Sequence, residues 1–260
     1  MSVLRDTPAT LLIHGLGGTA YDLGEVPRTL ESLGHTVYLP TLPGHAGEPR
    51  DLLKVGARDW LTCITDQYRE LRKQHSVVHL GGLCLGALLA LEVAKREQHR
   101  DRLLLMAPTV FLDGWALPKI TWMRHLVYRL GSLAERMRID ESEPYGIKND
   151  RLRRIVRSRF SRGDRFHYPY VPLATIREVD RLRSWVRRGL GKLACPTLLV
   201  YAREDEITSP RSAHYLSHRL GGALETLALA DSYHMLTVDN ERALLNQRVH
   251  AFMATETAHR

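Results

Sequence analysis

A cysteine stands at the centre of a Gly-x-Cys-x-Gly segment, Gly82-Leu83-Cys84-Leu85-Gly86. An apolar run ends here and a helix-like run begins, and a sharp strand-to-helix turn would project the Cys84 side chain clear of a sheet. The flanking glycines remove side chains that would clash across such a turn. A helix N-terminus also lowers the pKa of a nearby thiol. The pattern predicts a nucleophile, although a buried cysteine in a Gly-rich junction would look the same.

A base and an acid follow in later segments. Ser232-Tyr233-His234 comes after an apolar run at 223–228, and Ala202-Arg203-Glu204-Asp205-Glu206 comes at the end of a run at 197–202. The chain order is therefore nucleophile, acid, histidine, each beyond the end of a predicted strand. Chemistry collects at the carboxyl ends of such strands.

These positions predict a catalytic triad for acyl transfer. We assign Cys84 as the nucleophile, His234 as its base and Asp205 as the acid that orients the base. Asp205 is preferred to Glu204 and Glu206 on placement alone. The other histidines that attract notice, His45 and His167, we interpret as structural.

Small residues also follow the first apolar run, in His14-Gly15-Leu16-Gly17-Gly18. A loop of small residues can pass close to a nucleophile, and its backbone N–H groups can then bind an oxyanion. We predict that the N–H groups of Leu16 and Leu85 form this oxyanion hole, and that Gly15 contacts substrate. A simple turn is the alternative, whereas neither the dinucleotide nor the Walker phosphate-loop spacing is present.

The elements that must position these segments alternate along the chain. Apolar runs predict strands at 9–13, 36–39, 77–81, 102–107, 197–202 and 223–228. Helical spacing lies between and after them, at 21–33, 59–74, 87–95, 211–220 and 241–253. This alternation predicts an α/β fold, a mostly parallel sheet of about six strands with helices on both faces.

The alternation is interrupted in the middle of the chain. Residues 112–189 show Arg-rich helical stretches and no strand signal, and they are too many for a plain connection. We therefore expect a core of residues 1–111 and 190–260 with a helical insertion. Trp115 and Tyr233 are further candidate substrate contacts. Apolar residues near the start of the insertion are candidates for an acyl pocket or for packing between helices: Phe111, Leu112, Trp115, Leu117, Ile120, Trp122 and Met123.

Composition narrows the class of protein. The 260 residues are 44% hydrophobic and 25% charged, as in an ordinary globular protein. Three cysteines at unrelated spacings predict no disulfide framework, and no zinc-ligand spacing is present, so we expect no metal and no cofactor. No apolar run reaches the length of a membrane span. The first residues do not resemble a secretory signal, which leads us to expect a cytoplasmic protein.

The net charge of +8 is concentrated in one stretch. Residues 136–188 hold 15 Lys and Arg against 7 Asp and Glu. Such an excess fits an anionic small-molecule substrate, CoA or an acidic carrier protein, and it equally fits a solvated helix face. No nucleic-acid recognition motif accompanies it, so we expect no nucleic acid partner.

The whole chain resembles the α/β-hydrolase family, in particular small bacterial carboxylesterases and monoacylglycerol lipases. The residues that carry the resemblance are His14-Gly15-Leu16-Gly17, Leu42-Pro43-Gly44-His45, the Cys84 segment, Ala202 to Asp205 and Ser232 to Asp239. The resemblance implies that the insertion is a helical cap over the site, and that the two leading strands of the full fold are absent.

Cys84 departs from those esterases, which have serine at this position. A cysteine nucleophile is similar to that of dienelactone hydrolases and of polyhydroxyalkanoate synthases, which move acyl groups from thioesters. The resemblance implies hydrolysis of carboxylic esters or thioesters through an S-acyl enzyme. An acyltransferase using the same intermediate, a non-catalytic ligand-binding relative and a Ser-to-Cys replacement in a serine enzyme remain alternatives.

Overall fold

The computed structural model describes residues 4–118 and 122–254. Ile120, one of the candidates for the acyl pocket, lies outside them. Six parallel strands of the described chain form one sheet in the order β2-β1-β3-β4-β7-β8, which confirms the predicted fold class. The strands are β1 (Ala9–Ile13), β2 (Thr36–Tyr38), β3 (Val78–Leu83), β4 (Leu103–Met106), β7 (Thr197–Ala202) and β8 (Leu224–Leu229).

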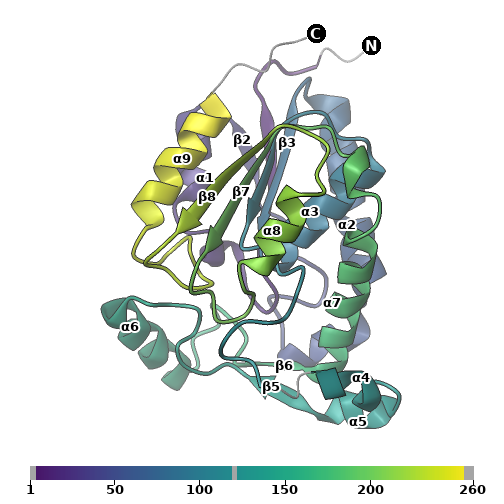
Figure 1. The fold of residues 1–260 in the computed structure, drawn as a ribbon, viewed down its shortest axis with the longest axis vertical. Helices are drawn as coiled ribbons and strands as arrows, with labels where there is room; N and C mark the ends of the chain where they lie inside the picture. Colours follow the sequence, from purple (N-terminus) through teal and green to yellow (C-terminus); the bar gives the residue numbers. More distant parts are fainter. Residues whose placement is uncertain (1–3, 119–121, 255–260) are drawn as a thin grey trace.

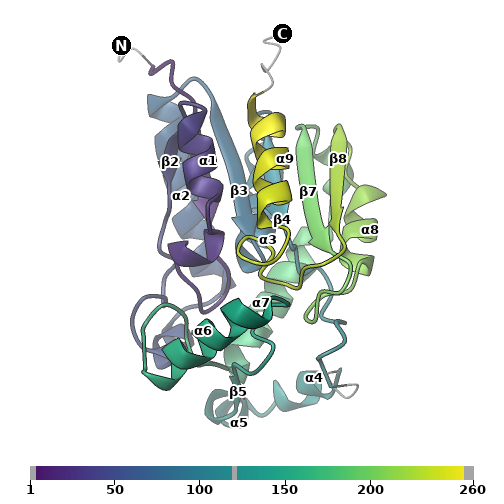
Figure 2. The ribbon, with the colours of Figure 1, turned by 90° about the vertical axis from the view of Figure 1, so that its left-hand side faces the viewer.

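Helices cover both faces of this sheet (Figures 1 and 2). Every residue of β1, β3 and β4 is buried, as expected for strands that are covered on two sides. Successive side chains point to opposite faces, so Leu11 packs in the cluster of Trp60 while Leu12 packs in the cluster of Val26. One face carries α1 (Val26–Ser32) and α9 (Arg242–Ala254); the other carries α2 (Ala57–Gln74), α3 (Leu85–Arg96) and α8 (Arg211–Ser217).

The helix predicted at 21–33 is wrong as a single element. A short 3₁₀ helix, η1 (Ala20–Leu23), comes first, and α1 begins only at Val26. Gly24 separates them with a φ of 56°, a conformation that suits glycine and cannot continue a right-handed helix. A Cβ at Gly24 would lie 2.3 Å from the carbonyl oxygen of Thr237, so the break brings this turn against the loop that carries His234.

Residues 112–189, which we call the cap segment, lie at the carboxyl ends of the sheet strands (Figure 1). Their helices are α4 (Arg124–Val127), α5 (Gly131–Arg136), α6 (Asp150–Ser161) and α7 (Leu173–Val186). The expectation of no strand here is wrong, because β5 (Arg138–Asp140) and β6 (Tyr170–Pro172) form an antiparallel pair. β5 is fully exposed and β6 ends in a proline, so neither has the apolar, β-branched sequence that reveals the equally short β2.

Two further features concern the described residues alone. None of their helices combines the length and the apolar character that crossing a bilayer requires. Nor do their His, Cys, Asp and Glu side chains gather in any group of three or more suited to holding a metal ion.

Candidate active site

Cys84 occupies the turn between β3 and α3. Its φ of 56° and ψ of −113° are unfavourable for a residue with a side chain. The turn is tight enough to require its glycines: a Cβ at Gly82 would lie 2.3 Å from the backbone carbon of Gly86, and one at Gly86 would lie 2.1 Å from the oxygen of Ile13. The sequence therefore folds into a strained elbow with a partly exposed thiol at its tip.

His234 and Asp205 meet from two separate loops. The Nδ1 of His234 lies 2.7 Å from the Oδ2 of Asp205, and both side chains are buried. The other carboxylate oxygen of Asp205 accepts hydrogen bonds from the N–H groups of Ile207 and Thr208. These contacts fix the carboxylate, which in turn selects the imidazole tautomer that presents a bare Nε2.

The thiol and the imidazole influence one another. The buried Nε2 of His234 makes no hydrogen bond among the described residues, which leaves it available to the Cys84 thiol. Burial raises the pKa of the Cys84 thiol, but the charge of His234 and the side-chain interactions with His234 and Thr109, with a smaller contribution from Arg183, outweigh burial and bring the pKa below its usual value. Burial lowers the pKa of His234, and the charges of Asp205 and Cys84 reverse this and hold it well above its usual value. The lowered pKa of Cys84 and the raised pKa of His234 both favour a thiolate–imidazolium pair.

The loop after β1 passes close to the thiol. A Cβ at Gly15 would lie at ordinary contact distance, 3.5 Å, from the Cβ of Cys84, so the backbone of this loop lies directly against the elbow. His14 holds the loop, since its Nδ1 donates to the Gly15 carbonyl and its Nε2 accepts from the N–H of Leu42. Within the described part of the chain, the N–H groups of Leu16 and Leu85 donate to no protein acceptor. Both N–H groups are thus without a protein acceptor, and their role in an oxyanion hole stays a prediction.

Glu206 is a buried carboxyl group beside the triad that the sequence did not distinguish. It is 3% exposed, and its Oε2 accepts the backbone N–H of His234 at 3.1 Å. Burial, reinforced by the neighbouring charge of Asp205, raises its pKa to about 7. Glu204 differs, because its side chain is half exposed and pairs with Lys148. Of the three acids in this loop, only Asp205 contacts the imidazole ring.

We expect Glu206→Gln to change how stability depends on pH. The folded pKa of Glu206 lies above the ordinary value of 4.5, so its stabilising contribution is complete below pH 4.5 and is lost as the pH rises through 7. The contribution is roughly 3 kcal/mol. Glutamine resembles the neutral acid and has no proton to lose. When the pH is raised from about 5 to about 8, the Tm should fall less in the variant than in the wild type. Equal decreases in Tm would contradict the raised pKa of Glu206.

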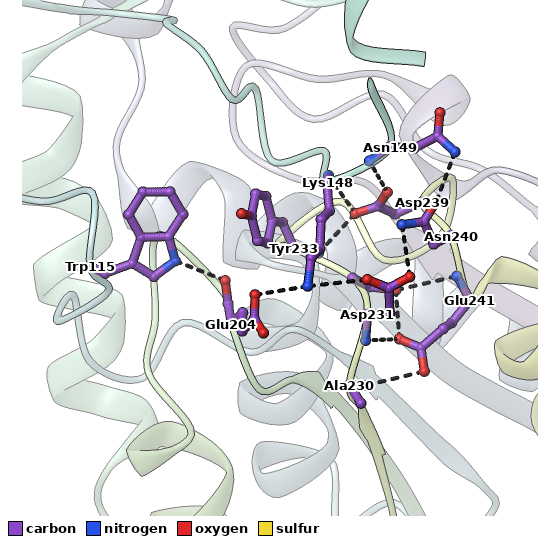
Figure 3. Close-up of polar contacts among 11 residues, drawn as sticks. Trp115, Lys148, Asn149, Glu204, Ala230, Asp231, Tyr233, Asp239, Asn240 and Glu241 are labelled. Atoms are coloured by element: carbon purple, nitrogen blue, oxygen red, sulfur yellow. Dashed lines mark hydrogen bonds and ion pairs between the residues drawn. The ribbon is translucent and has the colours of Figure 1, made fainter. Parts of the chain in front are cut away.

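The predicted substrate contacts Trp115 and Tyr233 lie beside a cluster of polar contacts that includes Glu204 and Lys148 (Figure 3). Their rings meet edge to face with centroids 5.5 Å apart, and the indole N–H of Trp115 donates to the Glu204 carbonyl. Trp115 is 59% exposed, and so is well placed for the mouth of a site and poorly placed for its apolar interior. The ammonium group of Lys148 lies over the Tyr233 ring and binds both Glu204 and Asp231.

Asp239 joins the cap segment to the histidine loop. Its Oδ2 accepts the N–H groups of Lys148 and Tyr233, and its Oδ1 accepts the N–H of Asn149, all at 2.8–2.9 Å (Figure 3). Tyr233 precedes His234 directly, so this carboxylate fixes the backbone that carries the His234 imidazole. The resemblance of 232–239 to an esterase histidine loop includes Asp239, but its role depends on contacts across some 90 residues of chain.

Three ionisable side chains near the thiol were not predicted as part of the site. Arg183 acts electrostatically on Cys84 from α7. Burial lowers the pKa of His167, and the charges of Asp22 and Glu141 and its hydrogen bond to the Tyr168 carbonyl, with a smaller contribution from Cys84, raise it above its usual value. Burial raises the pKa of Asp22 to about 6. His45, in contrast, accepts the N–H of Gly17 and supports the loop, as interpreted from the sequence.

The fold, the elbow and the order of the three side chains define an α/β hydrolase. A sequence model of the alpha/beta hydrolase family matches residues 10–247, and the chain belongs to that family. It is 24% identical to a thermostable monoacylglycerol lipase from Bacillus sp. (strain H-257), over 94% of this chain and 89% of that one. It is 23% identical to a carboxylesterase of Bacillus subtilis (strain 168), over 94% and 92%. The structure of a Paleococcus ferrophilus monoacylglycerol lipase superposes with a TM-score of 0.76 at 17% identity, covering 96% of each chain.

Proposed function

We propose that this protein hydrolyses carboxylic esters or thioesters through an S-acyl intermediate on Cys84. The observation that carries the proposal is the arrangement of the thiol. Cys84 lies at a strained elbow, and its charge helps to raise the pKa of the buried His234. The Nδ1 of that histidine lies 2.7 Å from the Oδ2 of Asp205. The similarity to a monoacylglycerol lipase and a carboxylesterase favours ester substrates.

In the first half of the reaction the thiol proton resides on the Nε2 of His234, and the sulfur attacks the carbonyl carbon. The carbonyl oxygen becomes an oxyanion, which accepts hydrogen bonds from the N–H groups of Leu16 and Leu85. The intermediate collapses by breaking the bond to the leaving group, and His234 returns the proton to that alcohol or thiol. Asp205 stabilises the imidazolium during this step.

In the second half, water replaces the leaving group. His234 takes a proton from the water as its oxygen attacks the acyl carbon. A second oxyanion forms in the same hole, the carbon–sulfur bond breaks, and the carboxylic acid leaves. A thiolate departs more readily than an alkoxide, so the intermediate formed from an ester can revert. Thioesters avoid this disadvantage because exchange between two sulfurs is nearly level in free energy.

The S-acyl enzyme is the species to detect. We expect mass spectrometry of the intact protein, quenched in acid during turnover of a p-nitrophenyl ester or an acyl thioester, to show one added acyl group. Peptide mapping should place the group on Cys84, and hydroxylamine should remove it. An enzyme that turns over substrate with no acyl group on Cys84, or with the group on another residue, would refute the proposed route.

The basic stretch at 136–188 gives a prediction about salt. We expect hydrolysis of an anionic substrate, such as an acyl-CoA, to slow as salt rises, because the Debye length falls from about 10 Å at 0.1 M to about 3 Å at 1 M. Part of this charge is already paired, since Arg153 binds Asp150 and Arg157 binds Glu143. Reversing the charges of Arg153, Arg154 and Arg157 together should reproduce the loss at low salt.

A neutral short-chain ester serves as the control for this measurement. Its hydrolysis should be insensitive both to salt and to the three reversals. If anionic and neutral substrates respond equally, the arginines of α6 are a solvated helix face with no part in recognition.

A further inference from the structure

Arg183 carries a buried guanidinium group, unlike two neighbouring arginines of the same helix. Only 6% of its side-chain surface is exposed, whereas Arg177 and Arg181 on the same helix, α7, are 37% and 51% exposed. Burying a charge is costly unless it is paired and hydrogen-bonded. The position of Arg183 therefore requires an explanation that its neighbours on the helix do not.

A single residue, Thr109, lies between the guanidinium group and the sulfur of Cys84. Its Nε donates to the carbonyl oxygen of Thr109 at 2.6 Å, and the Thr109 hydroxyl lies 3.9 Å from the Sγ of Cys84. Thr109 follows β4 at the carboxyl edge of the sheet, where the cap segment begins. Arg183 thus brings a positive charge from the cap to the wall of the site, where a group bonded to Cys84 must be accommodated.

The donors of Arg183 are only partly used. Nε binds Thr109 and Nη1 binds the Oδ1 of Asp180 at 2.7 Å. Among the hydrogen bonds within residues 4–118 and 122–254, none is donated by Nη2. The carboxylate of Asp180 is shared, because it also accepts from Arg124 and from the Tyr128 hydroxyl. A guanidinium presents five N–H groups and suits planar carboxylates, so one edge of Arg183 remains for an anionic ligand.

We propose that Arg183 binds a carboxylate carried by the substrate, so that the preferred substrates are esters or thioesters whose acyl chain ends in a carboxylate. This inference rests on the proposed function, since it concerns the acyl group that Cys84 receives. The same charge assists formation of the Cys84 thiolate. Activation of the thiol alone, or fastening of α7 to Thr109 alone, would affect charged and neutral acyl groups equally, whereas carboxylate binding affects their ratio.

The test compares two substrates of equal acyl length, the p-nitrophenyl monoester of adipic acid and p-nitrophenyl hexanoate. We expect the wild type to show a higher kcat/KM for the adipate monoester, and adipate to inhibit hexanoate hydrolysis more strongly than hexanoic acid does. In Arg183→Met the preference for the adipate monoester should fall about tenfold or more, chiefly through KM, as expected for loss of a charge-assisted hydrogen bond. Arg183→Lys should restore part of it.

Arg181→Met is the matched control, because Arg181 lies on the same helix, is half exposed and pairs with Glu178. It should leave the preference unchanged. A third substrate, the hexanoyl ester of p-hydroxybenzoic acid, carries the carboxylate on its leaving group. A preference for this ester alone would overturn the assignment to the acyl chain.

Failure of this inference is distinguishable from failure of the proposed function. If the wild type hydrolyses the neutral hexanoate through Cys84 but shows neither a preference for the adipate monoester nor selective inhibition by adipate, the carboxylate site is refuted and the hydrolase remains. These two measurements use the wild type alone, so the inference stays testable even if Arg183→Met does not fold. Equal losses for both substrates in a folded Arg183→Met would also refute it.

Discussion

Cys84→Ala is expected to abolish ester and thioester turnover, with a loss of about 10⁴-fold or more in kcat. The substitution removes the thiol that interacts with the imidazole of His234 and lies near the hydroxyl of Thr109. It keeps a Cβ at the elbow, where φ is 56°, so the backbone strain is the same as in the wild type and the protein should fold. Steady-state hydrolysis, with circular dichroism and Tm as checks on folding, measures the effect.

The other cysteines supply the controls. Cys63 lies in α2 and Cys195 is buried beside Thr197, and burial raises the pKa of both thiols, that of Cys195 to about 11. Cys63→Ala and Cys195→Ala should both retain activity. Alkylation should inactivate these two variants as it inactivates the wild type, because each still carries Cys84. A folded Cys84→Ala enzyme with wild-type turnover would remove Cys84 from the mechanism.

Cys84→Gly should be equally inactive but more stable than Cys84→Ala, because glycine adopts a positive φ without strain.

Asp205→Asn is expected to lower kcat by about 10⁴-fold with little change in KM. The asparagine oxygen can still accept from the N–H groups of Ile207 and Thr208, so the loop keeps its shape. Its amide, however, no longer offers a negative charge to the Nδ1 of His234, and an amide N–H facing the ring would favour the wrong tautomer. The pKa of His234 should fall in consequence, since Asp205 is the main group that raises it.

The neighbouring acids test whether this effect is specific. Glu204→Gln changes an exposed side chain that pairs with Lys148, and Glu206→Gln keeps a group able to accept the N–H of His234. Both should retain far more activity than Asp205→Asn. Pre-steady-state measurement of acylation would locate the loss at the chemical step. A mild effect of Asp205→Asn together with a severe effect of either glutamine would move the acid to that position.

The core of the fold was predictable because its signals are local. Buried strands such as Leu103–Met106 are continuous apolar runs, and glycine or proline marks their ends. The order of Cys84, Asp205 and His234 followed from the same runs, since each residue stands just past a strand. The strand β5 was missed because its residues Arg138–Asp140 are all exposed, and β6 because it ends in a proline, whereas β2 is equally short but has a β-branched, apolar sequence. The break at Gly24 was missed because a single glycine does not reveal its φ.

The groups that surround the triad were not predictable, because their contacts span long stretches of chain. Arg183 lies in a stretch rich in arginine, where the sequence favours a solvated face; only its burial against Thr109, 74 residues earlier, distinguishes it. Glu206 looked equivalent to Glu204 until the fold buried one and exposed the other. Position within a strand–loop–helix unit is encoded locally, whereas burial of a charge depends on which elements pack against it.

The carboxylate of Asp239 constrains how the cap segment can move. Its Oδ2 accepts the backbone N–H groups of Lys148 and of Tyr233, the residue before His234, and its Oδ1 accepts the N–H of Asn149. Displacement of the start of α6 would therefore break these hydrogen bonds or shift the backbone next to His234. The Asp239 carboxylate thus couples the position of α6 to the position of the backbone beside His234.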